Sequence, residues 1–400
     1  NYGSTMAGEL AKAGYYTQCV GKMHVHPLRN SLGFHNIDLH DGYLHNYRRP
    51  ELPAYESQKT ADDYFYWLRN EKGVAADVTD TGLDCNSWMA RPWIYEEKYH
   101  PTNWVTDRGI DFLRRRDPRM PFFLMLSYVR PHAPYDAPQV YFDLYDKPLA
   151  PPASGDWDDR ERLEREGHIF NNSVGPVNPT YIRRQQQGYY ACITHVDQQI
   201  GRFVLELIER GLMDNTVILF TSDHGEMLSD HCFCRKSLPY QGSIRVPMFL
   251  HGPASILGKT GVTDPSVAAL QDVMPTLLEL AGAEIPAHLE GRSLLHPGRE
   301  VLHGEHSYGE LSNHFMVTGE DKYIWFSQTG RERYFRLDTD PQEQHDAIAD
   351  PQWRERIGYL RSCLIRELEG RPEGYSDGTQ LIVGRPVRSV LDNATQPNCG

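Results

Sequence analysis

Short, wholly apolar runs alternate with amphipathic helical patterns through most of the chain, and this alternation limits the folds open to it. The clearest run, PFFLMLSY at residues 121–128, lacks the polar alternation of a half-buried strand and is typical of a strand buried on both faces. We predict strands at residues 15–20, 121–128, 216–221 and 246–251, and helices at 5–13, 61–70, 101–115, 179–210 and 267–281. Apolar strands between helices indicate an α/β fold with a large, mainly parallel central sheet flanked by helices.

Towards the C-terminus the apolar runs give way to alternating segments such as FMVTGEDKYIWFS and ERYFRLDTD. Alternation of this kind is typical of antiparallel strands, and a helix over residues 352–369 would pack on them. We therefore predict a large α/β domain over residues 1–297, a small C-terminal antiparallel-sheet-plus-helix subdomain over 298–370, and a tail over 371–400.

The charge balance excludes some classes of partner. The 400 residues carry a formal net charge of -13 at pH 7, whereas a non-specific nucleic-acid binder needs a basic surface. No run of about eighteen apolar residues is present, so we expect no membrane span. A local basic pocket on an acidic protein still binds small anions, so anionic substrates stay open.

The seven cysteines do not form a disulfide framework, because their number is odd and their spacing is irregular. His231, Cys232 and Cys234 form a cluster that faintly resembles a structural zinc site. A Cys-x-Cys pair without a second pair is a weak signal. Packed side chains are the plainer interpretation.

Polar side chains follow several of the predicted strands at the points where the strands end. Ligands bind at the carboxyl ends of strands in open α/β sheets, so these residues are candidates for one site. They are Lys22 and His24, His132, Asp223 and His224, and Lys236 in the loop beyond. Lysines and histidines beside a carboxylate suit an oxyanion with a metal ion. The plainer alternatives are that Asp223 caps a turn and that His132 is a packed loop histidine.

Six segments match, in order, those of one known family. They are AGYYTQCVGKMHVHP, LSYVRPHAPYDAP, THVDQQIGRFVLELIERGLMDNTVILFTSDHGEM, KSLPYQGSIRVPMFLHGP, LQDVMPTLLELAGAEIP and YFRLDTDPQEQHDAI. As a set they resemble the sulfatase branch of the alkaline-phosphatase-like superfamily. The resemblance covers nearly the whole chain, and it implies the alkaline-phosphatase-like fold.

The resemblance implies that Asp223 and His224 are two ligands of a divalent metal ion, which in this family is usually calcium. Many members carry asparagine where this chain has His224. An imidazole is a softer ligand than an amide oxygen, so manganese or zinc stays open as the metal.

The resemblance also implies the roles of the remaining candidates. Lys22 and Lys236 would bind the sulfate oxygens. His24 would lie beside the nucleophile and help to break down the covalent sulfate intermediate. His132, together with Lys236, would contact the ester oxygen and assist its departure.

Sulfatases of this type oxidise the cysteine of a Cys-x-Pro/Ala-x-Arg motif to formylglycine, whose hydrate attacks sulfur. None of the seven cysteines stands in such a motif, and two further acidic metal ligands of the family have no counterpart. The family's order places these elements upstream of residue 1, so we expect the intact protein to supply them. We expect these 400 residues alone to be poorly stable and inactive.

We predict hydrolysis of a sulfate ester, and the breadth of the family favours a carbohydrate over another small-molecule ester. The aromatic, histidine-rich segment 28–100 and the loop 136–178 would form the pocket for the leaving group. The alternatives are a phosphonate or phosphate ester hydrolase of the same superfamily, a choline sulfatase, and an inactive remnant that binds anions. The sequence does not decide between an exported and a cytoplasmic location.

Overall fold

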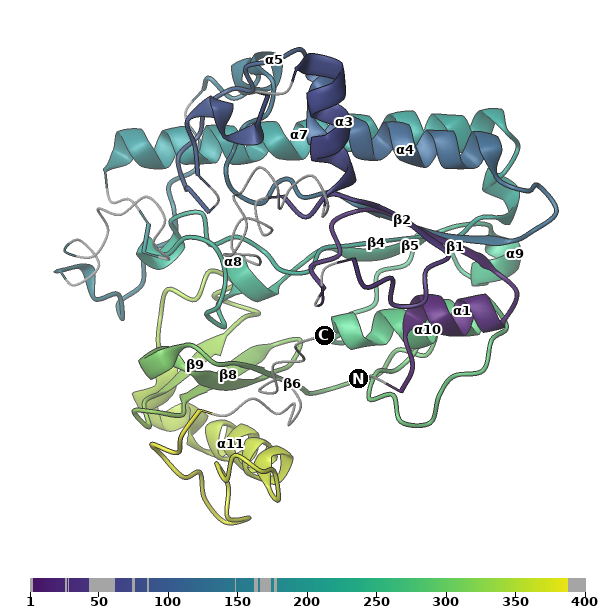
Figure 1. Ribbon diagram of the computed structural model, residues 1–400. Coiled ribbons are helices and arrows are strands. Elements are labelled where there is room, and N and C mark those ends of the chain that lie inside the picture. Colours follow the sequence, from purple (N-terminus) through teal and green to yellow (C-terminus); the bar gives the residue numbers. More distant parts are fainter. Residues whose placement is uncertain are drawn as a thin grey trace.

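The computed structural model describes residues 3–387, except residues 26, 28, 43–61, 74–75, 85, 148, 162–164, 166–173 and 176–177. The described residues form an α/β layer and a separate C-terminal antiparallel sheet with a helix (Figure 1). The predicted fold class is confirmed. The last part of the predicted tail lies outside the described residues, and the predicted domain boundaries stay predictions.

Strand β1 (Tyr16–Gly21) is the centre of a three-stranded parallel sheet. It pairs on one side with β2 (Asn36–Leu39) and on the other with β3 (Phe122–Ser127). Because β1 has a strand on each side, five of its six residues are buried. The strands at β1 and β3 were predicted. The short β2 was not, because its four residues lie within the segment interpreted as an insertion.

Strands β4 (Ile218–Thr221) and β5 (Met248–His251) form a second, two-stranded sheet. They were predicted as strands, but their pairing is antiparallel, which apolar runs alone do not reveal. The prediction that β3 is buried on both faces is wrong. All six β3 residues are half-buried, and among the described strands β3 pairs with β1 alone.

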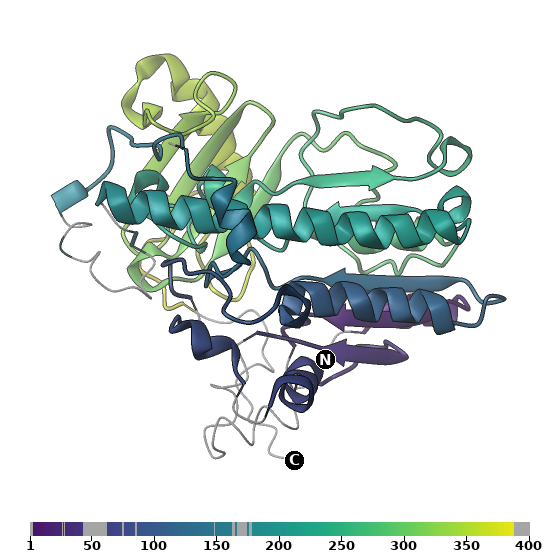
Figure 2. The same cartoon turned by 90° about the horizontal axis from the view of Figure 1, so that it is seen from above.

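Helices cover both faces of the strands (Figures 1 and 2). On one face α4 and α7 lie side by side, and on the other face lie α1 and α10. The longer helices are α1 (Met6–Lys12), α3 (Asp63–Lys72), α4 (Pro101–Arg115), α7 (Pro179–Glu209) and α10 (Val273–Leu280). The shorter ones are α5 (Gln139–Asp143), α8 (Gln241–Ile244) and α9 (Ala254–Leu257). The five longer helices agree with the sequence-based expectation.

The C-terminal sheet is antiparallel throughout, in the order β6-β7-β8-β9. Its strands are β6 (Leu302–His306), β7 (Asn313–Val317), β8 (Asp321–Phe326) and β9 (Glu332–Arg336). Helix α11 (Arg354–Leu368) packs Leu360 and Leu364 against Tyr323 and Trp325 of β8. The helix buries an apolar stripe on one sheet face, which is the usual basis of such a layer.

None of the described helices combines the length and the apolar character that a bilayer crossing requires.

Polar side chains are buried between α4 and α7. The ring of His195 is 1% exposed, and its Nε2 donates to Oδ1 of Asn103 at 2.7 Å. It contacts the ring of His100, which lies 3.4 Å from the carboxylate of Asp136. Burial, together with the neighbouring His100, lowers the pKa of His195 to about 2.

We expect His195 to make the protein less stable in acid. Below its ordinary pKa of about 6.5 the ring takes up a proton in the unfolded chain but not in the folded one. The free energy of unfolding therefore decreases as the pH is lowered below about 6.5, by up to about 1.4 kcal/mol per pH unit for this group. His195→Gln keeps a donor for Asn103 but does not titrate. When the free energy of unfolding is measured by urea at several acidic pH values, its slope against pH should be shallower in this variant by the equivalent of about one proton. His345→Gln is the control, because the His345 side chain is 78% exposed. Its slope of unfolding free energy against pH should equal that of the wild type. Equal slopes for His195→Gln and the wild type would contradict this.

Candidate active site

The end of β1 is held against the end of β3 by a glycine. Gly21 has φ of 102°, in the left-handed region, and a Cβ there would lie 2.0 Å from the carbonyl oxygen of Ser127. The absence of a side chain lets the backbone N–H of Lys22 donate to that oxygen at 2.9 Å. Lys22 is thereby fixed at the carboxyl end of the parallel sheet.

Lys22 reaches across to the loop after β4. Its Nζ donates to Oδ2 of Asp223 at 2.7 Å, and its side chain is only 14% exposed. Burial alone would raise the pKa of Asp223, but the ammonium of Lys22 lowers it to about 2. The carboxylate is therefore ionised over the whole physiological range.

The neighbouring His224 is held by its own backbone surroundings. Its Nδ1 donates to the carbonyl oxygen of Gly225 at 2.8 Å, and Ser222 Oγ donates to the His224 carbonyl at 2.7 Å. Burial lowers the pKa of the ring. With Nδ1 protonated, the lone pair of Nε2 is available to a ligand, and it lies 3.7 Å from Oδ2 of Asp223.

His132 and Lys236 form a second pair. His132 Nδ1 donates to the carbonyl oxygen of Ala133 at 2.7 Å, so its Nε2 accepts from Lys236 Nζ at 3.0 Å. Burial and the nearby ammonium of Lys236 lower the pKa of His132 to about 3. Burial also lowers the pKa of Lys236, followed by the charge of Lys22.

The two pairs meet. The rings of His132 and His224 pack edge-on with their centroids 5.9 Å apart. Contacts thus connect five of the six predicted residues, from Lys22 through Asp223, His224 and His132 to Lys236. His24 lies two residues beyond Lys22 with an exposed side chain. The residues come together as the sequence predicted, and their catalytic roles stay predictions.

Three acidic residues that hold these loops were missed. The carboxylate of Asp41 accepts from the backbone N–H groups of Met23 and His24, at 2.7 and 2.9 Å. These bonds fix the turn that follows Lys22. The sequence did not indicate a role for Asp41, because the segment around it shows little periodicity.

The other two missed residues hold the loops of the second pair. Asp136 binds Arg130 through both oxygens, at 2.5 and 2.6 Å, and so closes the loop that contains His132. Glu226 accepts from the backbone N–H groups of Leu228 and Arg235, the residue before Lys236. A sequence signal existed only for Asp136, which stands in the quoted PHAPYDAP segment.

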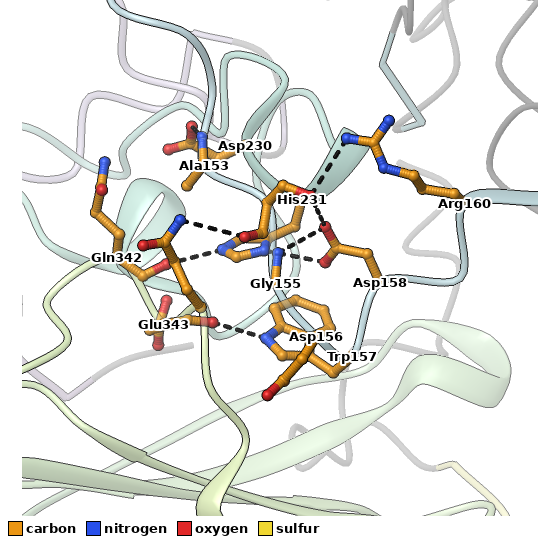
Figure 3. A network of polar contacts seen from close by, with 12 residues as sticks. Ala153, Gly155, Asp156, Trp157, Asp158, Arg160, Asp230, His231, Gln342 and Glu343 are labelled. Atoms are coloured by element: carbon orange, nitrogen blue, oxygen red, sulfur yellow. Dashed lines mark hydrogen bonds and ion pairs between the residues drawn. The ribbon is translucent and has the colours of Figure 1, made fainter.

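His231, Cys232 and Cys234 do not form a zinc cluster. Nδ1 of His231 lies 3.0 Å from Oδ1 of Asp158, and its Nε2 lies 2.9 Å from the carbonyl oxygen of Gln342 (Figure 3). Gln185 donates to the sulfur of Cys234 at 2.8 Å. Both ring nitrogens and this thiol therefore serve the local hydrogen-bond network, and the plainer interpretation holds.

The donor set at the strand ends fits part of the shell of a divalent ion. Two neighbouring ligands of one ion with bonds of about 2.3–2.6 Å lie roughly 3.3–3.7 Å apart. The 3.7 Å between Asp223 Oδ2 and His224 Nε2 falls in this range. The ammonium of Lys22 lies 2.7 Å from the same carboxylate oxygen, so a metal ion bound there would have to share that oxygen with Lys22 or displace it.

Two family models match the chain. The model described as Sulfatase matches residues 1–283, and N-sulphoglucosamine sulphohydrolase, C-terminal, matches residues 229–369. The chain belongs to the sulfatase family. An arylsulfatase of Clostridium perfringens is similar to this sulfatase, with 52% identity over 98% of this chain and 83% of that protein. The chain is accordingly a sulfuric ester hydrolase.

Solved structures agree on the fold. Phosphonate monoester hydrolase of Agrobacterium radiobacter has a TM-score of 0.69, with 22% identity over 90% of this chain and 79% of that one. A protein solved with its substrate D-glucosamine-2-N,6-O-disulfate has a TM-score of 0.64 at 18% identity, over 91% and 83%. At these identities the likeness establishes the alkaline-phosphatase-like architecture alone.

The sulfatase family generally uses a divalent metal ion and formylglycine. The described cysteines do not fit the second group, because none stands in the required motif and Cys19, Cys192, Cys232 and Cys234 are all buried. We therefore derive no step through a nucleophile of this chain.

We expect Gly21→Ala to disrupt the site and Gly14→Ala to spare it. Both glycines have positive φ, of 102° and 91°, so each alanine costs roughly 1–2 kcal/mol of backbone strain. Only at Gly21 does the new methyl meet Ser127, whereas Gly14 has nothing within 4 Å. Urea unfolding should show the larger loss of stability for Gly21→Ala. Equal losses would mean that the close approach does not matter.

Proposed function

We propose that the substrate is a carbohydrate sulfate ester and that the site is the set of side chains at the ends of β1, β3 and β4. The observation that carries the proposal is the continuous series of contacts from Lys22 to Lys236. A sugar is supported by the match to the N-sulphoglucosamine sulphohydrolase C-terminal model. The protein solved with a glucosamine disulfate adds a fold-level analogy.

Lys22 and Lys236 bind the sulfate oxygens in this proposal. The ammonium groups of Lys22 and Lys236 lie near the carboxylate of Asp223, and Lys236 also has Glu226 and Arg235 as charged neighbours. Charges that the fold has already placed stabilise an anion without further reorganisation. Lysines placed together in this way would let a chain with a net charge of -13 bind an anionic substrate locally.

Lys236 donates the hydrogen bond that the departing ester oxygen needs. Its Nζ is a donor, whereas Nε2 of His132 accepts from it and Nδ1 of His132 is occupied by Ala133. His132 therefore aims the ammonium instead of donating the proton itself. In this proposal His132 acts on the ester oxygen through Lys236. His24 would lie beside the nucleophile and help to break down the covalent sulfate intermediate.

Asp223 and His224 would hold a divalent cation, which we propose is calcium, with manganese or zinc as the alternatives that an imidazole ligand allows. Such an ion supplies positive charge against the sulfate oxygens. Formylglycine would supply the nucleophile from outside these residues.

We expect the protein to hydrolyse an aryl sulfate faster than the matched aryl phosphate. Lys236→Met should lower kcat/KM for the sulfate by about 10²- to 10³-fold, because it removes a donor to the reacting group. Lys12→Met is the control, since that side chain is 71% exposed and remote in the fold. A faster phosphate reaction would establish the phosphate ester hydrolase instead. Lys22-dependent sulfate binding without turnover would establish the anion-binding remnant.

We expect Asp223→Asn to lower the calcium content of the same purified protein, because it removes a charged oxygen ligand. Asp214→Asn changes an exposed aspartate at the other end of β4 and serves as the control. Metal content is measured by mass spectrometry after dialysis against the chosen ion. Equal metal content in the two variants would contradict the assignment.

A further inference from the structure

Two histidines and a glutamate converge on one face of the C-terminal sheet, and none of them belongs to the proposed catalytic set. His303 and Glu305 are two residues apart on β6, so their side chains share a face. His314 on β7 is the direct cross-strand partner of Glu305. The pairing of two neighbouring strands therefore brings the three side chains together.

The three ligand atoms form a compact triangle. Nε2 of His303 lies 3.3 Å from Nδ1 of His314, and Oε2 of Glu305 lies 3.2 Å from that Nδ1 and 3.8 Å from that Nε2. A triangle with these edges has a circumradius of about 2.0 Å, so one point lies that far from all three atoms. Bonds from zinc to imidazole nitrogen and carboxylate oxygen are about 2.0–2.2 Å long.

The surroundings of the triangle favour a cation. Oε1 of Glu367, on α11, lies 3.7 Å from the other ring nitrogen of His303. Carboxylates in this position orient histidine ligands in metal sites. Arg371 donates to the second oxygen of Glu305 at 2.9 Å and to Glu373 at 2.8 Å. Glu373 is 7% exposed, and its Oε2 has no hydrogen-bond partner among the described residues.

The net charge of the side chains around the triangle also favours a cation. Glu305, Glu367 and Glu373 contribute three negative charges and Arg371 one positive charge. The region keeps an excess of negative charge when both histidines are neutral. The Glu305 side chain is 35% exposed, which leaves the triangle open to solvent and to a water as fourth ligand.

We propose that His303, Glu305 and His314 bind a zinc-class divalent metal ion. The ion takes the place of the proton at Nδ1 of His314, and the neutral ring carries its single proton on Nε2 instead. Two imidazoles and bonds near 2 Å disfavour calcium, which takes six to eight oxygens at about 2.3–2.6 Å. The bound ion connects β6 to β7 and, through Glu367, to α11. This site is distinct from the pair Asp223 and His224.

The test is zinc titration of the purified, chelator-treated protein, with calorimetry and metal analysis. We expect the wild type to bind one equivalent of zinc more than His303→Gln or His314→Gln. Zinc should raise the unfolding temperature of the wild type and not of these variants. Glu367→Gln should weaken this binding by about 10- to 100-fold, because it removes only the orienting carboxylate.

His306→Gln is the matched control, since His306 ends the same strand and is not part of the triangle. It should keep the wild-type zinc stoichiometry. Equal zinc content in the wild type, His303→Gln and His314→Gln would overturn the proposal. So would calcium binding to the triangle as tightly as zinc. Circular dichroism of the metal-free variants establishes that they are folded.

Discussion

The ion pair between Lys22 and Asp223 connects two sheets that share no hydrogen-bonded strands among the described residues. Lys22 follows the central strand of the parallel sheet, and Asp223 follows the first strand of the antiparallel pair. The ammonium keeps the carboxylate ionised, and the carboxylate keeps the lysine in place beside a second lysine. Neither sheet alone would gather opposite charges at this point, so the site depends on how the two sheets are held.

The secondary structure could be predicted where burial leaves a pattern in the residues themselves. The runs that became β1, β3, β4 and β5 are apolar, although only β1 is largely buried, and α4 and α7 carry clear amphipathic stripes. The four residues of β2 carry no such pattern. Strand direction was harder, because β4 and β5 are as apolar as parallel strands and yet run antiparallel.

The candidate site could be predicted because its residues stand directly after strands, where sequence position fixes location. The residues that hold them are different. Asp41 and Glu226 accept from backbone N–H groups that the chain brings near only on folding, and a backbone donor leaves no mark in a sequence. His314 is likewise an ordinary strand residue until β7 pairs with β6 and places it opposite Glu305.

The half-buried edge strands affect how strongly the protein molecules associate with one another in solution. Phe249 of β5 is 52% exposed and stacks on Phe220, and β3 leaves a backbone edge unpaired within the described structure. Exposed apolar side chains and unpaired strand edges promote aggregation, and repulsion between molecules of like net charge opposes it. That repulsion fades as the buffer approaches the isoelectric point of about 5.8. We therefore expect concentrated samples to aggregate least in a mildly alkaline buffer of low salt concentration.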